Sequence, residues 1–408
     1  MRLTTNMIYG RNLDGILEAQ KRLVRAQDTL VKQTNILKPS DDPTGATKVV
    51  RFNEDLSRLE QFGRNGVRVE NQLTQQEGVL TSINEALNRA STLAIQGGNG
   101  ALSFSDRRAV ANELSLIKEE LLDLMNSKNS QGEYLFSGSK SDVIPFVQDS
   151  SGQFQYQGDE NVKKVQISET LKLETGVPGS GLTLFQDVKA RSSLTLDPNS
   201  TSTASGSYRL ENPDAFDRFQ KQNYVQIPPN PAGSNDFSIV LGAGTYQVLD
   251  SGGNVIENGN YTAGEPINFK GAEFNISGNA GDQLDFSLDP PNKNNMLNVM
   301  DEMILALQAN EVPGDDMFDT IKHSIYALQQ SQENIGFARS EIGGRLNVLT
   351  SVTLSNEDLE INLKEAKAKV SEVDMAEAIT ELQKQETALT VANQTFGRVT
   401  NLSLFNFL

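Results

Sequence analysis

The stretch LDGILEAQKRLVRAQDTLVKQTNIL, residues 13–37, decides the fold of this chain. Its apolar side chains recur as adjacent pairs spaced seven residues apart, with alanines between them. The pairs are Ile16 with Leu17, Leu23 with Val24, and Leu30 with Val31. This spacing predicts an amphipathic helix with one apolar stripe. At about 1.5 Å of rise per residue, the helix is too long and narrow to bury that stripe within itself. The stripe therefore needs a partner helix.

The other end of the chain carries a matching stripe, in the stretch MAEAITELQKQETALTVANQTF at residues 375–396. The simplest way to cover both stripes is to pair the two ends of the chain with each other. A pair of helices without a globular companion still leaves apolar surface for neighbouring copies of the chain. We expect the assembly interface to be formed by Ile16, Leu23, Leu30, Met375, Ile379, Leu382, Leu389, Phe396, Leu404 and Phe405.

The segment KPSDDP, residues 38–43, interrupts the first helical pattern. Proline restricts the residue before it, and Ser or Asp caps a helix that follows. We therefore expect an interlayer turn at Ser40, Asp41, Asp42 and Pro43. The two adjacent carboxylates also resemble a pair used in acid–base chemistry or metal binding, but a capped prolyl turn explains them more economically.

Helical periodicity resumes after this turn and returns in the last third of the chain. Two columns with a spacing of seven stand out, one at Leu59, Gly66, Leu73, Leu80, Leu87 and Ala94, the other at Leu328, Ile335, Ile342 and Leu349. Such columns predict long helices that pack along one face. Between these helical regions, short alternating segments are punctuated by Gly, Asn, Pro and Asp, which indicates β structure.

These patterns predict an α+β multidomain protein. Long N-terminal and C-terminal helices pair in a coiled-coil-like rod, and an all-β outer domain is inserted between them. We expect residues 1–40 and 360–408 to form a terminal helical domain, and residues 41–140 and 292–359 to form a helical rod domain. Residues 141–291 then form the β-rich outer domain.

Composition argues against several classes of function. The formal net charge of −17 disfavours binding to nucleic acids and to anionic membranes. No stretch approaches the roughly 20 apolar residues that span a bilayer, so we expect no membrane insertion. The first thirty residues lack an uninterrupted apolar run, so we expect no cleaved secretory signal.

Catalytic side chains are scarce as well. The chain has 0 Cys and 1 His, which removes thiol nucleophiles, Cys/His zinc sites and motifs that need two histidines. We expect His323 to be a structural or exposed side chain, and we expect no catalytic residue, cofactor or metal site.

Several segments resemble the flagellin-like family of bacterial flagellar proteins, and within it the hook–filament junction subunits. The segments are MRLTTNM at residues 1–7, PSDDPTGA at 39–46, GEYLFSG at 132–138, IGGRLN at 342–347, VSEVDMAEA at 370–378 and LSLF at 402–405. Any one of them is a weak signal, but the combination is specific. It covers both ends of the chain, whereas the β region matches only loosely.

The resemblance implies a structural subunit that connects the hook to the filament. It implies export of the unfolded chain through the flagellar type III apparatus, so that the chain is transiently cytoplasmic and then extracellular. The implied partners are further copies in a ring, the first hook–filament junction protein, flagellin and an export chaperone. Two alternatives remain: a flagellin filament subunit, or a flagellin-like surface protein whose β domain is a binding module.

Overall fold

The computed structural model describes residues 5–177, 181–199, 201–309 and 314–405. The chain divides into two compact units. Unit 1 contains Met1–Val69, Val165–Leu173 and Asn347–Leu408, and unit 2 contains Glu70–Lys164 and Glu174–Leu346. Both ends of the chain therefore belong to the same unit, while the β structure inserted between them belongs mainly to the other.

Unit 1 is built from long helices. It holds α1 (Thr5–Lys32), α7 (Met375–Phe405) and parts of two longer helices, α2 (Pro43–Gly97) and α6 (Asp315–Ser371). A Cβ added at Gly66 of α2 would lie 3.5 Å from Leu349 of α6, so these helices are in close contact there. Leu349 is buried, as its place in the predicted heptad column requires.

The helical part of unit 2 adds α3 (Phe104–Met125) and α5 (Met296–Gln308) to the remaining parts of α2 and α6. Ser103 caps α3, since its hydroxyl accepts a hydrogen bond from Asp106 N. In return, the Asp106 carboxylate accepts a hydrogen bond from Ser103 N. Most members of the predicted columns lie in the core, whereas Leu59 is half-buried. The fully buried side chains include Leu73, Leu80, Leu87, Ala94, Leu328, Ile335 and Ile342.

The β structure is antiparallel throughout its strand pairs. A five-stranded sheet has the order β10-β9-β8-β13-β6, and a three-stranded sheet has the order β11-β12-β7. Their strands are β6 (Leu194–Leu196), β7 (Ser205–Leu210), β8 (Asp236–Leu241), β9 (Thr245–Leu249), β10 (Val255–Asn260), β11 (Ile267–Phe269), β12 (Ala272–Ser277) and β13 (Gln283–Leu288).

Three further strand pairs form separate two-stranded sheets. They are β1 (Phe146–Gln148) with β2 (Phe154–Tyr156), β3 (Lys164–Gln166) with β4 (Lys172–Glu174), and β5 (Val188–Lys189) with β14 (Lys293–Asn294). The β5–β14 pair carries the chain into and out of the two larger sheets. The fold class predicted from the sequence is therefore confirmed: terminal helices enclose an antiparallel β domain.

Two short helices within the β region were not predicted. Helix α4 (Pro213–Asn223) begins at Asn212, whose side chain accepts a hydrogen bond from Ala215 N, with Pro213 at the first helical position. Its Phe216 and Phe219 enter the core of the β domain, where the Phe219 ring lies 5.0 Å from that of Phe269. A single π-helical turn, η1 (Leu182–Gln186), buries Phe185 elsewhere in unit 2.

Candidate assembly surfaces and the segments that position them

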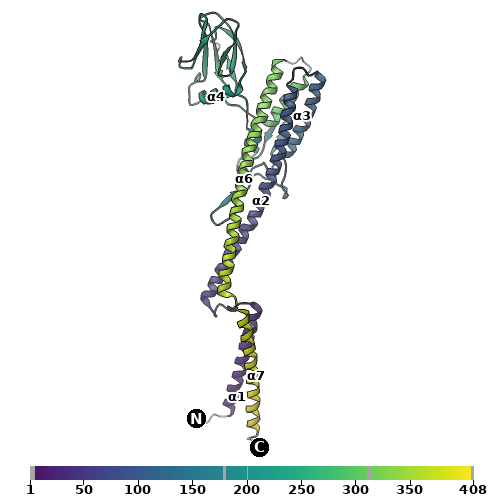
Figure 1. The fold of residues 1–408 in the computed structure, drawn as a ribbon, viewed down its shortest axis with the longest axis vertical. Coiled ribbons are helices and arrows are strands. Elements are labelled where there is room, and N and C mark those ends of the chain that lie inside the picture. The colour runs from purple at the N-terminus through teal and green to yellow at the C-terminus, as the bar shows by residue number, and fades with distance from the viewer. Residues whose placement is uncertain (1–4, 178–180, 200, 310–313, 406–408) are drawn as a thin grey trace. The chain divides into compact units, whose positions relative to one another are not determined.

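Helices α1 and α7 pair in an antiparallel arrangement, so the start of α1 lies beside the end of α7 (Figure 1). The Tyr9 ring lies 5.2 Å from that of Phe396, and Arg22 Nε donates to Gln385 Oε1 at 3.3 Å. At the inner end, Asn35 N donates to the carbonyl oxygen of Ser371 at 2.9 Å. Residue numbers rise along α1 as they fall along α7 in these three contacts, as an antiparallel pair requires.

Small and polar side chains form the most buried part of this pair. Ala19, Ala378 and Gln385 are buried. Alanines let two helix backbones approach closely, and the buried Gln385 amide is satisfied because it accepts from Arg22 and donates to Glu381 Oε1 at 2.6 Å. The contact between the two ends is therefore specific, but it buries few large apolar groups.

The candidate interface residues fall into three groups. Ile16, Leu23, Leu30, Leu382, Leu389 and Phe396 are half-buried in unit 1. Met375 and Ile379 are exposed. The side chains of Leu404 and Phe405 lie outside the described part of the structure, although their backbone belongs to α7.

A neighbouring column on α1 is more exposed than the predicted one. Leu17 and Val24 are 48% and 50% exposed, and Val31 is 80% exposed. Their spacing of seven places them on one side of the helix, where they form what we call the outer stripe. The outer stripe leaves three large apolar side chains with much of their surface in water, which costs free energy unless another surface covers them.

Geometry in the turn agrees with its sequence. The Asp41 carboxylate accepts a hydrogen bond from Lys38 N at 3.0 Å and forms an ion pair with Arg25 at 3.2 Å. Asp42 Oδ1 accepts from Gly45 N at 2.9 Å, which caps the start of α2, and Pro43 follows at the first helical position. Both carboxylates therefore accept hydrogen bonds from backbone N–H groups, and that of Asp42 caps α2. Ser40 is exposed beside them.

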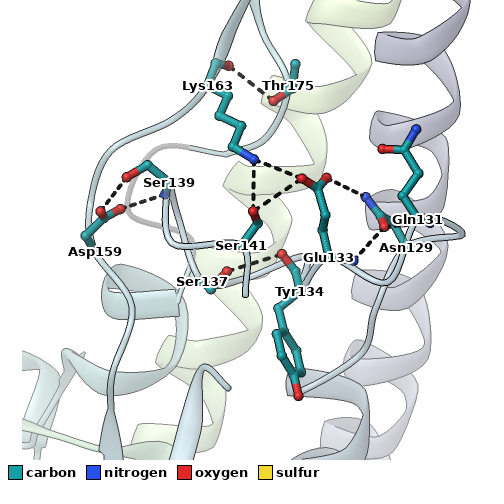
Figure 2. A network of polar contacts seen from close by, with 10 residues as sticks. All are labelled: Asn129, Gln131, Glu133, Tyr134, Ser137, Ser139, Ser141, Asp159, Lys163 and Thr175. Carbon is teal, nitrogen blue, oxygen red and sulfur yellow. Dashed lines mark hydrogen bonds and ion pairs between the residues drawn. The ribbon is translucent and has the colours of Figure 1, made fainter. Parts of the chain in front are cut away.

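The motif GEYLFSG forms a clasp at the end of α3. Its Glu133 carboxylate accepts from Lys163 Nζ at 3.0 Å, from Asn129 Nδ2 at 3.1 Å and from the Ser141 hydroxyl at 3.2 Å. Figure 2 shows these three side chains converging on Glu133, with Lys163 arriving from a distant segment. The donors, Lys163 first, lower the pKa of Glu133 below its ordinary value.

A second set of contacts closes the same segment. Ser139 donates to the Asp159 carboxylate through its N–H at 2.7 Å and its hydroxyl at 2.5 Å, as Figure 2 shows. Gly138 adopts a φ of 74°, and a Cβ there would collide with the Asp159 carbonyl, so this position requires glycine. Phe136 is fully buried against Phe185, at a centroid distance of 5.5 Å. The motif thus fixes where the chain leaves the helices.

The β3–β4 hairpin fastens two helices of unit 1. Its carbonyls at Gln166 and Ile167 accept hydrogen bonds from Asn65 of α2 at 2.8 Å and Asn356 of α6 at 2.9 Å. Arg58 of α2 lies 3.5 Å from the Glu169 carboxylate at the tip of the hairpin. The sequence did not predict these hairpin contacts, because no periodic signal marks them.

Metal-binding clusters are absent from the described part of the chain. No group of His, Cys, Asp and Glu side chains in residues 5–177, 181–199, 201–309 and 314–405 could hold a metal ion. His323 is exposed on α6. Among the same residues, no helix is both long enough and apolar enough to cross a bilayer.

Residues 3–141 match the bacterial flagellin N-terminal helical region. The flagellar hook-associated protein 3 of Salmonella typhimurium is 28% identical over 180 residues, which cover 44% of this chain and 56% of that protein. The chain thus spans little more than half the length of this curated relative.

Solved structures extend the likeness over most of the chain. FlgL of Xanthomonas campestris is 26% identical with a TM-score of 0.56, over 78% of this chain and 99% of that one. The flagellar junction protein FlgL of Legionella pneumophila shares the fold at 23% identity and a TM-score of 0.55, over 80% of this chain and 100% of that one. The resemblance to flagellin-like proteins predicted from the sequence is confirmed.

Proposed function

We propose that this chain is a structural junction subunit of the bacterial flagellum, which connects the hook to the filament and catalyses no reaction. The observation that carries the proposal is the likeness to Xanthomonas FlgL, which extends over 99% of that chain at 26% identity. The paired terminal helices with their uncovered apolar side chains support it, because a polymer subunit needs surface that only a neighbour covers.

In this proposal two neighbouring apolar columns of α1 contribute to assembly. The predicted column of Ile16, Leu23 and Leu30 is only half-buried where α1 pairs with α7, so it keeps surface for a neighbouring subunit, and the outer stripe beside it adds more exposed apolar surface. Fully burying a Val or Leu side chain contributes about 1.5–3 kcal/mol before the costs of association. Three such side chains per subunit add apolar contact at every interface of a ring.

The three-part domain division also belongs to this proposal. The terminal pair, residues 1–40 and 360–408, forms the innermost layer, and the turn at residues 38–43 separates it from the rod. The outer β domain, residues 141–291, is inserted between the two halves of the rod. The capped, ion-paired turn supports this division, because it ends one helical layer and starts the next with defined geometry.

Partners follow from the same position in the flagellum. The subunit contacts further copies of itself, the first hook–filament junction protein below it and flagellin above it. It is exported unfolded by the flagellar type III apparatus with the help of a chaperone, and it passes from the cytoplasm to the outside of the cell. Unfolded export is compatible with a chain of 0 Cys, since no disulfide has to form outside.

Deletion of the gene in its own bacterium tests the proposal. We expect hooks without filaments by electron microscopy, with flagellin secreted into the medium, and restoration of filaments when the full chain is supplied. Cells that grow normal filaments after the deletion would contradict the junction role. Loss of the filament material itself, with no flagellin in the medium, would favour the flagellin alternative.

A further inference from the structure

The chain contains three Asn-Gly dipeptides in three different backbone settings. Asn65-Gly66 lies within α2, Asn99-Gly100 lies in the turn between α2 and α3, and Asn258-Gly259 lies in strand β10. In such a dipeptide the backbone nitrogen of glycine can attack the side-chain amide carbon of asparagine, because glycine has no Cβ to obstruct the approach. Whether it does depends on how the backbone holds the two groups.

At Asn99 the side chain is hydrogen-bonded to the backbone just beyond Gly100. The residue is exposed, and its side-chain oxygen accepts a hydrogen bond from Ala101 N at 3.1 Å, an arrangement that folds the side chain back over the following peptide. Its carbonyl oxygen accepts from Leu102 N at 3.1 Å, which keeps the turn closed. Within the described residues, the N–H of Gly100 donates no hydrogen bond.

The other two dipeptides are protected. Gly66 lies in the interior of α2, where its N–H is committed to the helical hydrogen bond four residues back. In β10, Tyr261 N donates to the Gly244 carbonyl, and because N–H groups alternate along a strand, Gly259 N also points toward β9. An attack at either site therefore requires local unfolding first.

We propose that Asn99 is a site of spontaneous deamidation in the folded protein. The Gly100 nitrogen loses its proton and bonds to the Asn99 side-chain carbon, the bond from that carbon to the amide nitrogen breaks, and the nitrogen leaves as ammonia after taking up a proton. The resulting five-membered imide is opened by one water molecule. Attack at one carbonyl gives aspartate at position 99, and attack at the other gives isoaspartate.

Deamidation adds a negative charge just after the C-terminus of α2. The turn follows the C-terminus of α2, where the helix dipole already disfavours a negative charge. The turn is also tightly packed on α6, because a Cβ at Gly100 would lie 3.3 Å from the Phe318 ring and one at Gly98 would lie 3.5 Å from Ile321. Isoaspartate lengthens the backbone by one carbon, so this end of the helical core has to loosen.

The test follows all three sites in the purified full chain, incubated at physiological pH and temperature, both folded and in denaturant. Tryptic peptide 90–107 contains Asn99 as its single asparagine, so its conversion is read directly by mass spectrometry. In the folded chain we expect Asn99 to convert at least about tenfold faster than Asn65 and Asn258, which must open locally first. In denaturant the three rates should become similar.

The variant Asn99→Gln supplies the control, because a glutamine would have to close a larger ring and peptide 90–107 should then stay unmodified. Similar rates at the three sites in the folded chain would overturn the proposal. So would an Asn99 that converts in denaturant but stays intact in the folded chain, or conversion of peptide 90–107 that persists in Asn99→Gln.

Discussion

Asn65 on α2 and Asn356 on α6 donate hydrogen bonds to two consecutive carbonyls of one hairpin, those of Gln166 and Ile167. The hairpin therefore ties together two helices that are far apart in the sequence. Ile167 is buried at this point, so the polar contacts and the apolar anchor act at the same place.

Removing one amide should loosen the hairpin without unfolding the helices. We expect Asn356→Ala to cost about 1 kcal/mol, because an intramolecular hydrogen bond is worth about that much and this one is partly buried. Asn65→Ala should cost less, since its bond is exposed to water. The measurement is hydrogen exchange in residues 165–173. Asn362→Ala, at an exposed position of α6, is the matched control and should leave exchange unchanged.

The turn at residues 38–43 makes a second prediction. A Cβ at Gly45 would lie 2.8 Å from Ile36 Cδ1 and closer still to the Asp42 carboxylate. We expect Gly45→Ala to destabilise the protein by about 1–3 kcal/mol, because overpacking has that cost. Gly63→Ala, on the same helix with nothing within 4 Å of its Cβ, should instead stabilise by about 0.5–1 kcal/mol. Urea unfolding measures both, and equal effects of one sign would contradict the steric argument.

The clasp at Glu133 predicts a dependence on pH. Its pKa is lowered in the folded state, chiefly by the Lys163 ammonium, so the ionised carboxylate stabilises the fold above the unfolded pKa of about 4.3. That contribution is lost as the pH falls through the lowered folded pKa. We expect Glu133→Gln to be less stable than the parent chain at neutral pH, with the difference shrinking below about pH 4. A difference that grows on acidification would contradict this assignment.

The terminal helices carry a prediction about assembly. We expect Leu382→Asp to abolish joining of the filament while the β domain and the helices of unit 2 stay folded, because a desolvated carboxylate without a partner costs several kcal/mol. Leu382 is half-buried on α7, whereas Gln383 is exposed, so Gln383→Asp should be tolerated. Motility, electron microscopy and the amount of exported protein compare the two variants. Motile Leu382→Asp cells with normal filaments would mean that this column is not an interface.

Periodic features of the fold could be predicted from the sequence. A column such as Leu73, Leu80 and Leu87 repeats one burial environment along a helix, so composition and spacing carry the signal. The capped turn at Asp42 and Pro43 was predictable for a local reason, since cap and proline act on adjacent residues.

What the sequence could not provide depends on contacts between distant segments. The amides of Asn65 and Asn356 bind backbone carbonyls of the hairpin, and such bonds leave no pattern in either helix. Helix α4 had a local signal in Asn212 and Pro213, which was hidden among turn residues of similar composition. The predicted interface column contains Ile16, whereas the adjacent Leu17 is the more exposed of the two. Spacing could not separate them, because adjacent apolar columns look alike until the partner helix is placed.

Immunogold labelling of intact flagella with antibodies against the β domain, residues 141–291, tests the central claim most directly. A junction subunit occupies one short zone, so we expect gold particles in a single band between hook and filament, absent from flagella of the deletion strain. Labelling along the whole length of the filament would contradict the account and identify the chain as a filament subunit.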